Sequence, residues 1–154
     1  MRTWPVSSVA SANHPHRWTA LSVGAGRRPA VAFWADPESA KASLVMARRE
    51  DRIWSKETIA HLRGGRCSVA LGPDGRCRIA FVDLEERSVH VALEEAGGWA
   101  IDPVATKLTG PLLGSVSIVV APDGTQFVAW WSGAGLVISR GHLEGWIHET
   151  LDPN

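Results

Sequence analysis

The residues best suited to hold a ligand are two tryptophans that end apolar segments close to polar side chains. Trp34 is followed by Asp36, and Trp131 is followed directly by Ser132. Asp83 closes a third apolar segment of the same kind. An indole beside a carboxylate or a hydroxyl can supply an apolar platform together with polar anchors. These five residues form the candidate ligand-binding set, and burial of both indoles in the core is the competing interpretation.

Two members of this set could also act as a pair of catalytic carboxylates. A glycosidase needs two carboxyl groups that face each other across about 5 to 10 Å. Asp36 and Asp83 follow equivalent segments of two successive repeats, so they could line one face of the fold. The third repeat has Ser132-Gly133 at this place, and solvated loop carboxylates are the simpler interpretation. We therefore assign no catalytic residue, and an enzyme is the less favoured alternative.

Metal and redox chemistry find little support in the sequence. The six histidines are scattered and lack the spacing of metal ligands. Cys67 and Cys77 flank a tight turn, and their places on two antiparallel strands would be offset by about 10 Å, which is too far for a disulfide. Two free thiols fit a reducing compartment, so a cytoplasmic location is favoured. No nucleotide-cofactor motif is present, and we expect no cofactor and no metal.

Composition sets limits on the partners of this chain. Its 154 residues carry 16 basic and 16 acidic side chains, so the formal net charge is zero. Without a basic excess, we expect binding neither to nucleic acid nor to a membrane. The apolar run 116–121 is far too short to span a bilayer. Residues 1–16 lack the apolar core of a secretory signal peptide.

Four tryptophans reveal an internal repeat that must position the candidate residues. Trp4, Trp54, Trp99 and Trp146 open similar segments and lie 50, 45 and 47 residues apart. This period is typical of a propeller blade with four short strands. Positions shared by all repeats usually carry structure, so we expect these tryptophans to pack between neighbouring units.

Each unit contains four apolar segments separated by polar or glycine-bearing turns, such as the matching Pro-Asp-Gly turns at 72–75 and 121–124. The predicted strands are 18–23, 29–35, 42–48 and 52–60, then 67–71, 76–83, 88–94 and 98–105, then 116–121, 125–131, 135–140 and 145–151. The sequence thus predicts an all-β fold of three four-stranded antiparallel propeller blades, with an extra N-terminal outer strand from Trp4 to Ala10. In this single domain, a leading strand and linker at 1–15 precede blades at 16–62, 63–108 and 109–154.

One stretch of the repeat carries a resemblance to a known family. Ser-Val-Ala-Leu-Gly-Pro-Asp-Gly-Arg-Cys-Arg-Ile-Ala-Phe-Val-Asp at 68–83, followed by Val-His-Val-Ala and Gly-Gly-Trp, resembles the bacterial β-propeller repeats of sialidase-like and fucose-binding-lectin-like proteins. The resemblance covers nearly the whole chain and implies a β-propeller fold. In lectins of this fold, tryptophan side chains stack on sugar rings. The sialidase Asp-box is incomplete, because Asp74-Gly75 and Asp123-Gly124 lack their Ser and Trp partners, and the chain has no tyrosine to act as a nucleophile.

Three blades cannot close a ring, because propellers typically have four to eight. An open array leaves apolar blade faces in water, so we expect self-association, for example of two chains into a six-bladed ring. The alternative is that the chain is a segment of a longer propeller. The favoured function is a non-catalytic binding module for a glycan, with sites between blades. A protein-interaction scaffold without independent activity is the alternative, and a sialidase-like glycoside hydrolase is the weakest one.

Overall fold

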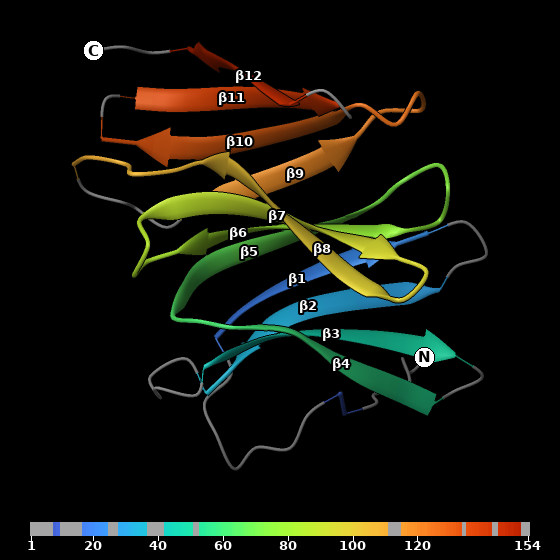
Figure 1. Cartoon of the computed structure of the whole chain (residues 1–154). Helices are drawn as coiled ribbons and strands as arrows, with labels where there is room; N and C mark the ends of the chain where they lie inside the picture. Colours follow the sequence, from blue (N-terminus) through green and yellow to red (C-terminus); the bar gives the residue numbers. More distant parts are fainter. Residues whose placement is uncertain are drawn as a thin grey trace, which may run out of the picture.

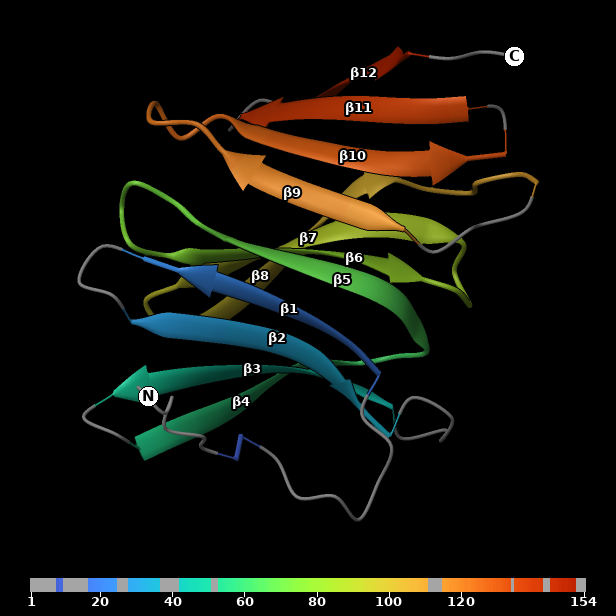
Figure 2. The same cartoon turned by 180° about the vertical axis from the view of Figure 1, so that it is seen from behind.

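A computed structural model gives the structure of the protein and describes residues 8–9, 17–24, 28–36, 42–50, 53–110, 115–133, 135–142 and 145–151. This part of the chain forms three four-stranded antiparallel sheets, which follow one another in chain order (Figures 1 and 2). In each sheet, strands that are consecutive in sequence are neighbours. Within the described residues, no helix is long and apolar enough to cross a membrane.

We call the three sheets blade 1, blade 2 and blade 3. Blade 1 consists of β1 (Arg17–Val23), β2 (Pro29–Ala35), β3 (Ser43–Glu50) and β4 (Ile53–His61). Blade 2 consists of β5 (Gly64–Leu71), β6 (Cys77–Asp83), β7 (Ser88–Glu95) and β8 (Gly98–Ala105). Blade 3 consists of β9 (Val116–Val120), β10 (Gln126–Ser132), β11 (Gly135–His142) and β12 (Gly145–Thr150).

This architecture confirms the all-β fold and the three four-stranded units expected from the sequence. Each of the twelve predicted strands is present, and the ends differ by at most three residues. The largest difference is at β5, which begins at Gly64 because a bulge between Gly64 and Cys67 extends its pairing with β6. The predicted leading strand at 4–10 lies outside the described residues, apart from Ser8 and Val9, which are not in a strand.

The matching Pro-Asp-Gly turns have the same structure in blades 2 and 3. Gly75 donates its N–H to the carbonyl of Gly72 at 3.0 Å, and Gly124 donates to Ala121 at 2.9 Å. Gly75 and Gly124 have φ angles of 75° and 87°, a region that favours glycine. Each turn therefore fixes the register between the first and second strands of its blade.

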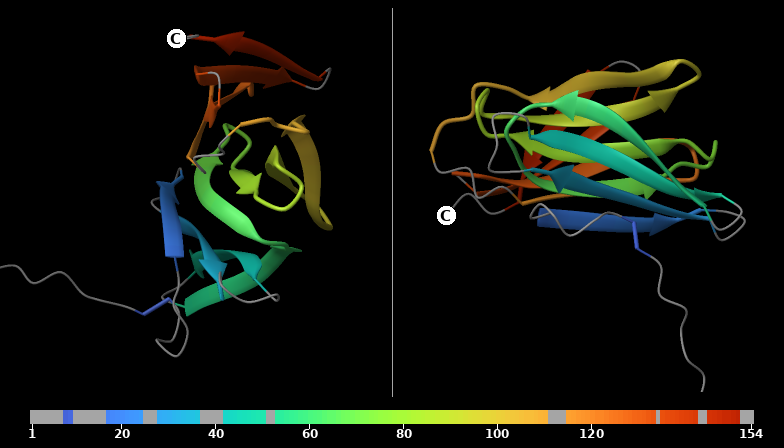
Figure 3. Two further views of the ribbon diagram at one scale, coloured as in Figure 1. Left: turned by 90° about the vertical axis from the view of Figure 1, so that its left-hand side faces the viewer. Right: turned by 90° about the horizontal axis from the view of Figure 1, so that it is seen from below.

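The blades pack face to face, with their first strands side by side. Strands β1, β5 and β9 are neighbours in space, and the fourth strands lie away from them (Figure 3). We call the face that a blade turns toward the next blade in the chain its leading face, and the opposite face its trailing face. One apolar cluster fills the junction between blades 1 and 2, and a second fills the junction between blades 2 and 3. The core therefore lies between blades.

Trp34 forms the centre of the junction between blades 1 and 2. Its side chain is 0% exposed and meets the ring of Phe81 edge-on, with ring centroids 6.3 Å apart. Gly64 of blade 2 lies directly against the indole, since a Cβ added there would come within 1.8 Å of Cζ2 of Trp34. The Trp34 ring thus requires a glycine at position 64.

Polar contacts supplement the apolar junction between blades 2 and 3. The backbone N–H of Ile118 in β9 donates to Oγ of Ser68 in β5 at 3.2 Å, which links the two first strands. The indole N–H of Trp130 donates to Oγ of Ser139 at 2.8 Å, and both side chains are buried. The buried indole N–H therefore has a partner, which avoids the cost of an unsatisfied donor.

Two of the repeated tryptophans and both cysteines are parts of these junctions. Trp54, Trp99 and Trp146 are partly buried, and each packs against the cluster on the trailing face of its own blade. This confirms the expected role between units for Trp99 and Trp146. Trp54 packs on a cluster that contains no residue of another blade among the described residues, and Trp4 lies outside them. Cys67 and Cys77 are buried and free, as expected. Burial raises the pKa of the Cys67 thiol to about 12.

Candidate functional site

The two candidate tryptophans have opposite environments. Trp34 is fully buried, so its indole fills the core position that the sequence left open as an alternative. Trp131 is 37% exposed on the leading face of blade 3. It lies in an apolar hollow of about 310 Å³, whose walls include Ser117, Ala129 and Leu136. Of the two indoles, Trp131 is the one that presents surface to a ligand.

The three polar candidates lie where the second strand of each blade turns toward the third. Asp36 directly follows β2 and has a φ angle of 51°. Asp83 is buried at the end of β6, and its Oδ1 accepts the N–H groups of Glu85 and Glu86 at 2.9 and 3.0 Å. Ser132 donates its hydroxyl to the carbonyl of the first residue of β11 at 3.0 Å. The contacts of Asp83 and Ser132 show that both stabilise turns.

The structure brings some of the candidates together and separates the others. Gly64 is the ladder partner of Asp83 and also lies against the Trp34 ring, so Trp34 and Asp83 belong to one junction. Trp131 is on the leading face of blade 3, beyond the next junction. The role of these residues in ligand binding stays a prediction.

Two hydroxyl–imidazole pairs deserve comparison with hydrolase chemistry, in which a histidine activates a nucleophile. Ser88 lies 2.6 Å from Nε2 of His90, and Ser139 lies 2.8 Å from Nδ1 of His148. Both hydroxyls are buried, at 1% and 0% exposure, so a substrate cannot reach them. Each pair gives a buried serine hydroxyl a hydrogen-bond partner inside its own blade. Among the described residues, no group of three or more His, Cys, Asp and Glu side chains is placed to hold a metal ion.

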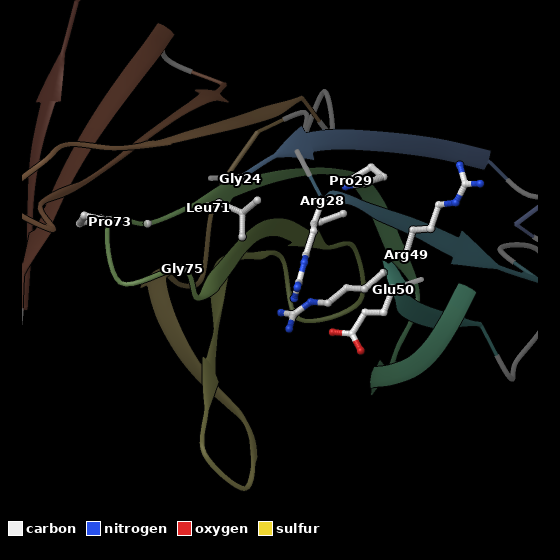
Figure 4. A pocket seen from close by; sticks show the side chains of 11 residues that line it. Gly24, Arg28, Pro29, Arg49, Glu50, Leu71, Pro73 and Gly75 are labelled. Carbon is white, nitrogen blue, oxygen red and sulfur yellow. The ribbon is translucent and has the colours of Figure 1, made fainter. Parts of the chain in front are cut away.

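A cavity of about 420 Å³ opens between blades 1 and 2, at the opposite end of the strands from the candidate residues. Blade 1 contributes Arg28, Arg48 and Glu50 to its lining, and blade 2 contributes Leu71 and Pro73. Figure 4 shows the side chains of Arg28 and Glu50 extending toward the space between the blades. One wall is therefore charged, and the other is apolar.

An ion pair across the junction fixes one of these arginines. Nη2 of Arg48 donates to Oε2 of Glu94 in blade 2, and the same oxygen accepts the backbone N–H of Cys77 at 2.9 Å. Burial works to raise the pKa of Glu94, but the hydrogen bonds from Arg48 and from the Cys77 amide outweigh it and hold that pKa below its usual range. The hydrogen bond to Glu94 also raises the pKa of Arg48. The guanidinium is thus charged and held at the mouth of the junction.

The opposite wall of the cavity is held in place by a second ion pair. Arg78 donates to both carboxylate oxygens of Asp74, at 2.5 and 2.9 Å, across the turn that carries Pro73. This bidentate contact lowers the pKa of Asp74 to about 2. A Cβ at Gly72 would come within 2.0 Å of Nη1 of Arg78, so glycine leaves room for the guanidinium.

Blade 3 carries a hollow of about 480 Å³ at the corresponding place on its leading face, lined by Phe127, Arg140 and Ile147 among others. Arg48 is the ladder partner of Ala30 in β2, and Arg140 occupies the matching place in β11. Within the described residues, no further blade follows to cover this hollow. It therefore corresponds to one half of the cavity between blades 1 and 2.

Sequence reasoning missed these arginines, because it followed the aromatic residues to the other end of the strands. A signal was available in the repeat itself. Leu44 and Leu136 open the matched third segments, and four residues later Arg48 and Arg140 occupy the same position. The contact between Arg48 and Glu94 joins residues of two different blades, which the repeat does not indicate.

Comparisons with known proteins bear on the fold. No protein-family model and no curated protein matches the sequence. Among solved structures, a fucose lectin from Kordia zhangzhouensis in complex with methyl-fucoside is similar with a TM-score of 0.56 and 9% identity, over 87% of this chain and 99% of that one. The chain has a fold found in a fucose lectin. A triple arginine-to-alanine mutant of AofleA from Arthrobotrys oligospora is similar with a TM-score of 0.66 and 19% identity, over 88% of this chain and 41% of that one.

These similarities support the expected resemblance to fucose-binding-lectin-like proteins at the level of the fold. The expected resemblance to sialidase-like proteins gains no support from sequence families. The chain also spans about two fifths of the AofleA chain that it matches. What the cavity can do chemically must therefore be argued from its own residues: fixed hydrogen-bond donors, a carboxylate acceptor and an apolar wall.

Proposed function

We propose that this chain is a carbohydrate-binding module of the lectin type, with its site in the cavity between blades 1 and 2. The observation that supports this most is the cavity itself, which joins a charged wall to an apolar wall in about 420 Å³. This volume suits a small ligand. The fucose lectin that shares the fold is in complex with methyl-fucoside, and we take the same class of ligand as the starting point for this chain.

The residues that line the cavity would make different kinds of contact with a sugar. Arg28 and Arg48 supply N–H donors for hydroxyl and ring oxygens, and Glu50 supplies an acceptor for hydroxyl protons. Leu71 and Pro73 offer an apolar surface to the C–H groups of the ring. Since Arg48 is already held by Glu94, little side-chain entropy is lost when a ligand binds. This arrangement binds a ligand and requires no chemical step.

The exposed indole of Trp131, with Ser132 beside it, is the competing place for a sugar. A ring stacked on Trp131 would lie in the hollow on blade 3, on the leading face and away from the arginines of blade 1. The two candidate sites predict different effects of a substitution at Trp131 on the affinity for a sugar. Trp131→Ala leaves the affinity unchanged if the cavity between blades 1 and 2 is the site, and abolishes binding if the indole is the platform.

Glycan-array screening followed by isothermal titration calorimetry, with methyl-fucoside as the first probe, tests the proposal. We expect Arg28→Ala and Arg48→Lys to weaken binding about tenfold or more, because a charged hydrogen bond contributes about 1.5–3 kcal/mol. Arg48→Lys keeps the positive charge next to Glu94 and removes the planar fork of donors. Arg66→Ala is the matched control, since Arg66 is exposed on β5 and does not line the cavity.

Two results would overturn the proposal. One is an empty array together with no heat on titration of methyl-fucoside. The other is a bound sugar whose affinity does not change in the Arg28 and Arg48 variants. An array without signal for a chain that captures a protein ligand would favour the interaction scaffold instead.

A further inference from the structure

The leading face of blade 3 is equivalent, position by position, to the leading face of blade 2, which is buried. The ladders align the two blades so that equivalent positions can be compared. On blade 2 these positions pack against blade 3, and on blade 3 they are uncovered within the described part of the chain. The equivalent pairs are Ser68 and Ser117, Ala70 and Val119, Ala80 and Ala129, Val82 and Trp131.

Exposure differs sharply between the two copies of this face. Val82 is 2% exposed and Ala70 is 8% exposed, whereas Trp131 is 37% exposed and Val119 is 59% exposed. At two of the four positions the uncovered side chain is also the larger one, because Val119 replaces Ala70 and Trp131 replaces Val82. A contiguous apolar face with larger side chains is typical of a surface that another protein covers.

The serine that makes a polar contact between blades 2 and 3 has an equivalent on the uncovered face of blade 3. Ser68 accepts the backbone N–H of Ile118 and so links the first strands of blades 2 and 3. Ser117 stands at the equivalent position on β9 and is exposed. It offers the same acceptor to the first strand of a following blade.

We infer that a second copy of this chain covers the leading face of blade 3 with the trailing face of its own blade 1. The chain already uses this leading-to-trailing contact twice, between blades 1 and 2 and between blades 2 and 3. Two chains joined by two such contacts form a closed ring of six blades with twofold symmetry, which lies within the usual range of propellers. The zero net charge of the chain leaves no general repulsion between copies.

The face that the second copy offers has the matching chemistry. Leu21 and Val23 of β1 lie on the trailing face of blade 1 and are 66% and 57% exposed, so they are open to an apolar partner. Phe33, Val45 and Ala47 on the same face are buried, and Val9 packs against them. Trp54 borders the cluster as Trp99 and Trp146 border the two internal junctions.

Docking would also complete a second ligand site, and this part of the inference rests on the proposed function. The hollow around Arg140 lacks the wall that blade 2 supplies at the Arg48 cavity. In the second copy, Val23 has the place in β1 that Leu71 has in β5, and it is 57% exposed. The ring would therefore contain the Arg48 cavity and the Arg140 cavity of both copies.

Sedimentation velocity and light scattering on the full chain test the docking without any ligand. We expect twice the mass of the chain, and we expect Trp131→Asp to raise the dissociation constant about 30-fold or more, as for a buried aromatic anchor. Val119→Asp changes a largely exposed residue of the same face and should act in the same direction. Leu84→Asp is the matched control, because Leu84 is equally exposed, at 38%, and lies in the turn after β6.

The outcomes separate the docking from the proposed function. A monomer at all concentrations, or a dimer that both blade 3 variants leave intact, would overturn the docking. A ladder of ever larger species would also overturn it, since an open chain of contacts does not close. A dimer without glycan binding keeps the docking and refutes the proposed function, and a monomer that binds glycan does the reverse.

Discussion

Replacing Gly64 by alanine probes the junction between blades 1 and 2 with a single methyl group. The added Cβ would lie 1.8 Å from Cζ2, 2.1 Å from Cη2 and 2.4 Å from Cε2 of Trp34. Ordinary carbon contacts are about 3.5–4.0 Å long, so the indole must move by more than an ångström. Trp34 is fully buried and held by Phe81, which leaves it no free space in which to move.

The cost of this overlap can be worked out from known core substitutions. An extra methyl group in a well-packed core costs about 1–3 kcal/mol. Alanine recovers about 0.4–1 kcal/mol by restricting the unfolded chain. We therefore expect Gly64→Ala to lower the free energy of unfolding by about 1–2 kcal/mol. For a chain of this length, that corresponds to a fall of about 2–8 °C in Tm.

Urea unfolding followed by circular dichroism measures this loss, with Gly97→Ala as the control. A Cβ at Gly97 meets no atom within 4 Å, so we expect a change below about 0.5 kcal/mol there. In a Trp34→Phe background, Gly64→Ala should cost at least about 1 kcal/mol less, because the smaller ring leaves room. Equal costs in the two backgrounds, or no cost at Gly64 in the native chain, would refute this account of the junction.

Three further outcomes follow from the described contacts. Asp74 has a folded pKa of about 2, below its ordinary 3.8, so its contact with Arg78 stabilises the fold above about pH 4 and is lost as the pH falls toward 2; Asp74→Asn should flatten acid unfolding in that window. Cys67 should resist Ellman's reagent at pH 8 until denaturant is added, because burial raises its pKa to about 12. Ser139→Ala should cost about 1–3 kcal/mol in urea unfolding, since it leaves the Trp130 N–H unpaired, whereas an unchanged midpoint would contradict this.

The fold could be predicted because its signals are local. The apolar run of β6 is buried at every position, as expected for a strand between two neighbouring blades. The turn at 72–75 has the hydrogen bond and the positive φ that its Pro-Asp-Gly sequence indicates. The start of β5 could not be predicted, because the bulge after Gly64 lies where the Trp34 ring of another blade approaches the backbone.

The candidate site could be predicted only in part, because contacts between blades decide it. Trp34 and Trp131 look alike in the sequence, and they differ because, among the described residues, a following blade covers the first and none covers the second. Arg48 gains its fixed position from Glu94, which is 46 residues away. Pattern reasoning places a residue on a strand, but it does not say which side chain of the next blade will meet it.

At the two internal junctions, the large tryptophan side chain comes from opposite faces: from the leading face of the earlier blade at the first, and from the trailing face of the later blade at the second. At the first junction the large ring of Trp34 belongs to the leading face and meets Gly64, whereas at the second Trp130 belongs to the trailing face, in one apolar cluster with the small side chains of Ala70 and Ala80. The two internal junctions are therefore not interchangeable. Although the repeats share a backbone, their order along the chain is encoded in side-chain size, and shuffling the blades would disrupt assembly.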